Sequence, residues 1–188
     1  MELLRLPGGI PDNVDEAALL RRVRHGDETA FAQLYGRYQR PIYRYAARMC
    51  GDESADDVVQ ETFMVVLRMG HRFDEARGTF GGYLFGIARN LILKRMGRRY
   101  EEPLGDELDP PDTSAYADVL ATLSRQERTD AVHAAVQSLP PVFREVVVLC
   151  DLEELDYLDA ARILACPIGT VRSRLHRARV LLASKLVG

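Results

Sequence analysis

The chain has 188 residues, which is enough for one or two small domains with hydrophobic cores. Hydrophobic residues make up 47% of it and Trp is absent, a composition typical of a globular, mainly helical protein. The net charge of −3 excludes a uniformly basic nucleic-acid binder, yet residues 77–99 hold six Lys or Arg and no acid, and residues 101–118 hold seven acids and no base. Such blocks indicate separate electrostatic roles along one chain.

Cysteine and histidine are too scattered for a metal centre. The three cysteines, Cys50, Cys150 and Cys166, form no CxxC pair, and the four histidines lie far apart in the sequence. We therefore expect no zinc site, no disulfide framework and no cofactor, with a reducing cytoplasm as the location. Residues 1–14 lack the features of a signal peptide, and no apolar run reaches the ~20 residues that span a bilayer. We expect a flexible lead-in over residues 1–14 and no membrane insertion.

Four helices are predicted between residues 15 and 100, because apolar residues recur there at helical spacing. The expected helices run from near Asp15 to His25, from Thr29 to about Met49 with a local kink or join at Pro41, from a Ser54 cap to near Met69, and from about Phe80 to Arg99. Together they predict one compact helical domain over residues 15–100.

The third of these helices has a buried face and an acidic face. Val59 and Phe63 belong to the apolar stripe. The opposite face carries Asp57, Gln60, Glu61 and Met64. The like charges at positions 57 and 61 disfavour an isolated helix slightly. Either these acids favour the positive end of the helix dipole, or the face binds a partner surface that bears Arg or Lys.

The fourth helix carries an unusual polar row beside its apolar stripe. Tyr83, Asn90 and Lys94 fall within roughly 40° of one another on a helical wheel. An aromatic ring, an amide and an ammonium group in one row suit stacking on, and reading of, an unstacked base. The basic side chains that would hold phosphates are Arg89, Arg95, Arg98 and Arg99. The alternative is that the tyrosine and the asparagine are hydrogen-bonding groups between helices.

Residues 101–124 read as a flexible acidic linker. The segment EEPLGDELDPPDT at 101–113 contains three prolines and mostly acids, and cannot build a core. Helical pattern resumes at about Ser114 and stops at Leu139, where Pro140 and Pro141 follow. Another helix is expected from Phe143 to Leu152. We assign residues 125–188 to a second helical domain.

The end of the second domain reads as a helix-turn-helix. Asp156 can cap a first helix, and Pro167 can open the second. In the second helix, Ile168, Val171, Leu175 and Ala178 cluster on one side. The side chains on the other side and its flanks are Thr170, Arg172, Ser173, Arg174, His176 and Arg177. Such a helix suits a DNA major groove. The alternative is a solvated basic helix that closes a bundle.

Three motifs carry a resemblance to a known family. SADDVVQETF, FDEARGTFGGYLFGIARNLILKRMGRR and LPPVFREVVVLCDLEELDY followed by CPIGTVRSRLHRAR stand in this order along the chain. The sequence resembles a bacterial RNA polymerase sigma factor of the sigma-70 family, extracytoplasmic-function group, over about residues 15–100 and 125–185. It departs from the family in having Tyr83 where Trp is usual and Ala165 where Gly is common.

The resemblance implies an all-α protein with two domains that directs promoter-specific initiation and has no enzymatic activity of its own. It implies that Asp57, Gln60, Glu61 and Met64 bind the β′ clamp helices of core RNA polymerase, with the β flap as a further contact. It implies a pocket for a flipped base of the −10 element, formed by the loop of residues 73–79 and by Asn90. The expected −10 DNA-binding residues are Phe73, Arg77, Tyr83, Arg89, Asn90, Lys94, Arg98 and Arg99. The helix-turn-helix would read the −35 element, the linker would thread the active-site cleft, and an anti-sigma factor is an expected partner.

Two other classes of protein compete with this interpretation. A free-standing helix-turn-helix regulator would explain the segment from Pro167 to Arg179, but not the acidic helix or the polar row, and it normally needs a dimer. A helical adaptor without DNA contact is disfavoured by the two acid-free basic segments. Nuclease chemistry would need an acidic metal cluster beside a basic groove, and the sequence offers none.

Overall fold

The computed structural model describes residues 15–97 and 125–187. The expected lead-in over residues 1–14, the expected linker over 101–124, and the candidate phosphate-binding residues Arg98 and Arg99 lie outside the described residues. Within the described ranges all regular structure is helical. None of the helices in these ranges is long and apolar enough to cross a membrane.

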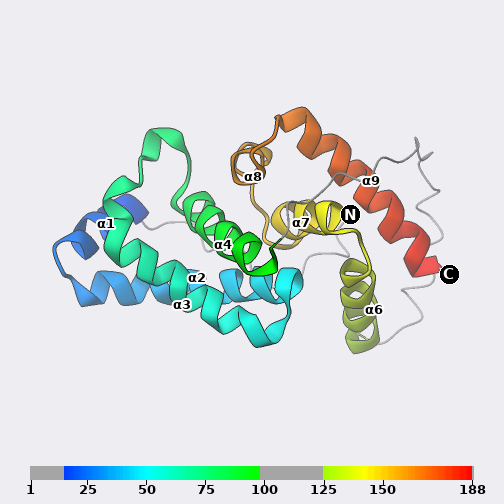
Figure 1. Ribbon diagram of the computed structural model, residues 1–188, viewed down its shortest axis with the longest axis horizontal. Coiled ribbons are helices and arrows are strands. Elements are labelled where there is room, and N and C mark those ends of the chain that lie inside the picture. Colours follow the sequence, from blue (N-terminus) through cyan, green and yellow to red (C-terminus); the bar gives the residue numbers. More distant parts are fainter. Residues whose placement is uncertain (1–14, 98–124, 188) are drawn as a thin grey trace.

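Figure 1 shows two groups of helices that meet at α4 and α8. The first group consists of α1 (Glu16–Arg24), α2 (Glu28–Cys50), α3 (Asp52–Met69), the short helices η2 (Gly70–Arg72) and η3 (Glu75–Arg77), and α4 (Phe80–Met96). The second consists of α6 (Arg125–Gln137), α7 (Pro141–Val147), the π-helical η4 (Val148–Leu152), α8 (Tyr157–Leu164) and α9 (Ile168–Val187).

Side-chain caps fix most of the helix starts. Asp15 accepts a hydrogen bond from the backbone N–H of Ala18 at 2.9 Å, and Asp27 accepts one from that of Ala30 at 3.0 Å. The predicted Ser54 cap is wrong, because α3 begins two residues earlier, directly after Gly51. The positive φ of 88° at Gly51 turns the chain within one residue, a conformation that glycine adopts without strain.

The core of the first group is built around α2, which packs against α1, α3 and α4. Its buried face includes Leu34, Tyr38, Ile42 and Tyr45, each at most 2% exposed. Pro41 lies inside α2, which runs on as one helix from Glu28 to Cys50 instead of dividing there. The fourth helix ends at Met96, earlier than Arg99, because Gly97 adopts the left-handed conformation.

The core of the second group lies between α7, α8 and α9. Val146 to Leu149 are fully buried and helical, although the three valines are β-branched. Val171, Leu175 and Ala178 face this core, as their spacing predicts. Ile168 was predicted to join them but is 38% exposed, because it is the first residue of α9 and lies at the edge of the turn.

Candidate nucleic-acid interface

A cavity of about 630 Å³ lies between α4, the loop that precedes it, and α8. Four of the residues predicted to bind the −10 element line it: Phe73, Arg77, Tyr83 and Asn90. They come from the loop of η2 and η3 and from one side of α4. Of the row that the sequence pattern predicted for an unstacked base, Tyr83 and Asn90 line the cavity and Lys94 does not, while Phe73 and Arg77 are residues that the family resemblance implied.

Two aromatic side chains, Phe73 and Tyr83, line this cavity, and both contact the buried ring of Phe80. The ring of Phe73 lies 5.5 Å from those of Phe80 and Tyr83, in edge-on and tilted arrangements. The Tyr83 hydroxyl donates a hydrogen bond of 3.4 Å to the backbone carbonyl of Met69, and partial burial raises the pKa of Tyr83. The Tyr83 side chain is therefore uncharged, and it is held by the Phe73 ring and by the hydrogen bond of its hydroxyl to Met69. Phe80, at the predicted start of the fourth helix, is 2% exposed and supports these rings from the core.

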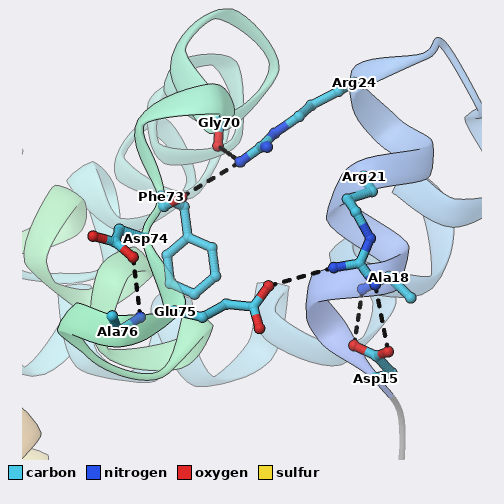
Figure 2. A network of polar contacts seen from close by, with 9 residues as sticks. All are labelled: Asp15, Ala18, Arg21, Arg24, Gly70, Phe73, Asp74, Glu75 and Ala76. Carbon is cyan, nitrogen blue, oxygen red and sulfur yellow. Dashed lines mark hydrogen bonds and ion pairs between the residues drawn. The ribbon is translucent and has the colours of Figure 1, made fainter.

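The loop that carries Phe73 is held by α1, as Figure 2 shows. The guanidinium of Arg24 donates hydrogen bonds to the carbonyls of Gly70, at 2.6 Å, and of Phe73, at 3.5 Å. Arg21 pairs with Glu75 at 3.4 Å. No pattern in the sequence predicts a role for α1 at the site, because contacts across about fifty residues leave no periodic signal.

The other predicted −10 residues of α4 lie apart from the cavity. Lys94 is exposed one helical turn beyond Asn90. Arg89 points to the second group of helices, where its Nε lies 2.9 Å from the Oε1 of Glu145. The Tyr45 hydroxyl donates to the same oxygen at 2.8 Å. Burial raises the pKa of Glu145, while the neighbouring Arg89 and the hydrogen bonds oppose this shift.

The acidic face of α3 is exposed, but its charges are partnered within the chain. Asp57, Gln60, Glu61 and Met64 all face solvent. Arg95 of α4 lies 2.7 Å from the carboxylate of Glu61 and 3.5 Å from that of Asp57. The acidic face is therefore contacted by a cation of this chain, Arg95, where the sequence pattern suggested Arg or Lys of a partner. These ion pairs also engage Arg95 away from the phosphate that the pattern suggested for it. Leu67, 51% exposed, extends the apolar edge of this face and was missed, although it lies three residues after Met64.

The helix-turn-helix is present in α8 and α9. The Asp156 carboxylate caps α8 by accepting from the backbone N–H of Asp159 at 2.7 Å. Ala165 makes the turn in the left-handed conformation, with φ at 53°. Of the residues predicted to bind the −35 element, Arg172, Ser173 and His176 are exposed, and Thr170, Arg174 and Arg177 are partly exposed. Arg179 instead pairs with Asp151 at 2.6 Å and ties α9 to η4.

Comparison with known proteins matches both groups of helices to one family. Residues 34–101 match Sigma-70 region 2, and residues 129–182 match Sigma-70, region 4. The ECF RNA polymerase sigma factor SigE of Mycolicibacterium smegmatis is 37% identical over 174 residues, which cover 86% of this chain and 64% of that protein. The ECF RNA polymerase sigma-E factor of Haemophilus influenzae is 32% identical, over 93% of this chain and 97% of its own.

Solved structures agree with this match. CnrH, solved in complex with the cytosolic domain of CnrY, superposes with a TM-score of 0.66 at 26% identity, over 90% of this chain and 95% of its own. The sigma factor RpoE of Bartonella quintana, solved with the anti-sigma factor NepR, gives 0.62 at 25% identity, over 83% and 96% of the two chains. The chain therefore belongs to the sigma-70 family, among the extracytoplasmic-function RNA polymerase sigma factors.

Proposed function

We propose that this chain binds core RNA polymerase and directs promoter-specific initiation by recognising the −10 and −35 elements and melting DNA. It acts as a transcription initiation factor rather than an enzyme. The observation that carries the proposal is the occurrence, in one chain, of a cavity on α4 that is lined by aromatic side chains and an amide, and of a helix-turn-helix in α8 and α9. An ordinary regulator needs only the second of these.

We assign the two tasks to the two halves of the chain. Residues 15–100 bind the polymerase and the −10 element, residues 125–188 bind the −35 element, and residues 101–124 form the acidic linker between them. In the first half, Phe73 and Tyr83 offer stacking faces for a flipped base, and the Asn90 amide offers a donor and an acceptor for its edge. Arg77, Arg89, Lys94, Arg98 and Arg99 are assigned to the phosphates. Stacking on aromatic rings offsets the few kcal/mol that extrusion of a base costs.

The acidic face of α3 is our candidate for the surface that binds the β′ clamp helices. The Arg95 pairs with Asp57 and Glu61 are exposed, and exposed ion pairs contribute little to stability. A basic partner surface can therefore replace Arg95 at small cost. Met64 and Leu67 supply exposed apolar area beside the charges. The β flap is assigned to the second half.

Reading of the −35 element is assigned to α9. Its exposed or partly exposed candidates are Thr170, Arg172, Ser173, Arg174, His176 and Arg177. Because a major-groove helix reads base edges with arginine and hydroxyl side chains, this face suits duplex DNA. Two structural neighbours are solved with the cytosolic domain of CnrY and with the anti-sigma factor NepR. We propose that this chain, acting in the cytoplasm with the polymerase, also has an anti-sigma partner.

Run-off transcription tests this proposal. Core polymerase is mixed with the purified chain and a pool of genomic promoter fragments, and transcripts are mapped. We expect specific starts only when both proteins are present, and a weak footprint from the chain alone. The reason is that two small reading surfaces gain little from each other until the polymerase fixes their spacing. A tight, specific footprint by the chain alone, with no transcripts, would instead identify a free-standing regulator.

A further inference from the structure

The floor of the cavity between α4 and α8 is open above Gly86. This residue lies on the side of α4 that lines the cavity, and a Cβ added to it would meet no described atom within 4 Å. Tyr83 and Asn90 line the same side, one turn before it and one turn after it. The distance between them along the helix axis is roughly 10 Å at about 1.5 Å per residue. This stretch of α4 therefore has room for a flat heterocyclic ring over its backbone.

The groups around this open space suit a purine base. Phe73 and Tyr83 contribute aromatic rings, and Ile87 contributes a branched aliphatic side chain. The Asn90 amide carries a donor and an acceptor, which together match the N6 and N7 edge of adenine. The cavity volume of about 630 Å³ lies in the range of sites that take small organic ligands.

Two carboxylates that line the cavity are already engaged by the chain. On the α8 side, Asp159 pairs with Arg162 at 2.9 Å, so this part of the lining is neutral as a whole. On the loop of η2 and η3, Asp74 accepts a hydrogen bond from the backbone N–H of Ala76 at 3.0 Å. The lining therefore has two further guanidinium groups to account for.

These two are Arg72 and Arg77, and their charges favour a phosphate ester. Both side chains are exposed at the cavity, and neither has an ion pair or a side-chain hydrogen bond to another described residue. Burial raises the pKa of Tyr83 and Arg72 opposes this shift, so the Arg72 guanidinium lies near the Tyr83 hydroxyl. A phosphate monoester carries about two negative charges at pH 7, and guanidinium groups bind its oxygens through charge-assisted hydrogen bonds.

The distribution of charge around the cavity favours a free nucleotide over a nucleotide within a strand. A nucleotide inside a strand has a phosphate on each side, whereas a nucleoside monophosphate has one, at its end. Both unpaired cations lie on the loop of η2 and η3, while α8 contributes a guanidinium that Asp159 already engages. In this arrangement of the helices, the site is matched to one terminal phosphate.

We propose that the cavity is a binding site for a free nucleoside monophosphate, and that adenosine 5′-monophosphate (AMP) has the matching chemistry. The base lies over Gly86 between Tyr83 and Asn90. Arg72 and Arg77 bind the phosphate. Since Tyr83 and Asn90 are also our candidates for the flipped −10 base, the nucleotide competes with the promoter for the same groups. This consequence rests on the proposed function, but the binding itself can be measured without polymerase or DNA.

A single fluorescent reporter in the cavity tests this inference. The chain contains no Trp, so Tyr83→Trp introduces one reporter, whose fluorescence a stacked base quenches. The purified full chain is titrated with AMP, adenosine and ribose 5-phosphate, and calorimetry of the wild type gives the affinities without the reporter. We expect AMP to bind with a Kd below about 1 mM. Adenosine and ribose 5-phosphate should bind at least about tenfold more weakly, because each lacks one half of the contacts.

Two variants with matched controls separate the base from the phosphate. Gly86→Leu fills the open floor, and its control is Gly36→Leu, because Gly36 is also inside a helix, lies outside the cavity, and has no described atom within 4 Å of an added Cβ. Arg77→Ala removes a phosphate contact, and its control is Arg68→Ala, which removes an exposed arginine of α3. We expect both cavity variants to bind AMP at least about tenfold more weakly, and both controls to bind it as the wild type does. Adenosine should be weakened by Gly86→Leu alone.

Circular dichroism checks the fold of each variant, and Arg77→Ala decides the outcome if Gly86→Leu does not fold, because Arg77 is exposed. Absence of saturable AMP binding would overturn the site. Equal affinities for AMP and ribose 5-phosphate, or cavity variants that bind AMP unchanged, would overturn it as well, since they indicate a general anion effect. A chain that binds AMP but directs no initiation would refute the proposed function and leave this site standing. Initiation without AMP binding would do the reverse.

Discussion

Asn90 and its neighbours give the first prediction at the scale of single residues. Asn90 is exposed at the cavity, and no core contact depends on it. Asn90→Ala should leave folding and −35 binding unchanged, while it slows formation of the open complex, since the amide is the group placed to hydrogen-bond the flipped base. Permanganate reactivity of thymines near the start site measures opening. Normal reactivity on duplex promoter would rule out this role, whereas rescue on a pre-melted template would support it.

Arg177 is the corresponding test on α9. It lies near the centre of the face assigned to the −35 element. We expect Arg177→Ala to weaken binding by the holoenzyme by about 1–3 kcal/mol if the guanidinium contacts a base, with reduced discrimination among −35 sequences. A contact to phosphate alone would weaken all sequences equally. Competition binding with a set of −35 variants distinguishes the two, and Lys185→Ala, on the last turn of the same helix, is the control.

Glu145 gives a pH-dependent prediction. Burial raises its pKa above the ordinary value of 4.5, so the folded chain binds this proton more tightly than the unfolded chain does. Its contribution to folding is therefore fully present below pH 4.5 and is lost as the pH rises through the raised pKa. Relative to Glu145→Gln, which does not titrate, the wild type should lose unfolding free energy as the pH rises above 4.5. Chemical denaturation of both chains across this range measures the difference, and a difference that grows with pH would contradict the assignment.

At the scale of elements, the turn of the helix-turn-helix carries backbone strain. Ala165 adopts a left-handed conformation, which costs an L-residue about 1–2 kcal/mol and glycine almost nothing. Ala165→Gly should therefore stabilise the chain by about 1 kcal/mol, less the greater chain entropy that glycine releases on unfolding. Urea denaturation measures the change. A destabilised variant would mean that the alanine methyl contributes more by packing than its backbone costs.

The sequence predicts the elements well where capping and periodicity are local. Asp156 caps α8 as predicted, and the buried side of α9 follows its spacing from Val171 to Ala178. The errors fall at positions set by the backbone. Ser54 is a good capping residue, but α3 begins before it, directly after Gly51 at positive φ. Ile168 lies too close to the turn to reach the core.

At the scale of the whole molecule, contacts between distant segments were beyond the sequence pattern. Arg89 and Arg95 have the same basic character as any phosphate ligand, and only the fold assigns them to Glu145 and to Glu61. The cavity itself could be anticipated, because its aromatic and amide residues lie within one loop and one helix. The part of its lining that α8 contributes could not be anticipated, since α8 is about eighty residues away along the chain.

The acidic face of α3 yields a prediction at this scale. Reversal of both charges, by Asp57→Arg with Glu61→Arg, should abolish initiation while the C-terminal half keeps its weak DNA binding, because the altered face repels a basic polymerase surface and also Arg95. Asp52→Arg, at the start of the same helix, is the control for added positive charge. Run-off transcription and polymerase pull-down measure the effect. Unaltered transcription by the double reversal would move the polymerase surface elsewhere.

Arg24 of α1 donates hydrogen bonds to the carbonyls of Gly70 and Phe73, so the conformation of the loop that lines the cavity depends on the docking of α1. Among the residues of η2 and η3 whose burial is described, Gly70 alone is buried, and the segment forms only short helical turns, so it has little cooperative stability of its own. Segments of this kind open and close as a unit with whatever braces them. Fraying of the nine-residue α1 and exchange of amide hydrogens in the loop are then one event, and the readiness of the pocket to receive a base depends on how firmly α1 is docked beside that loop.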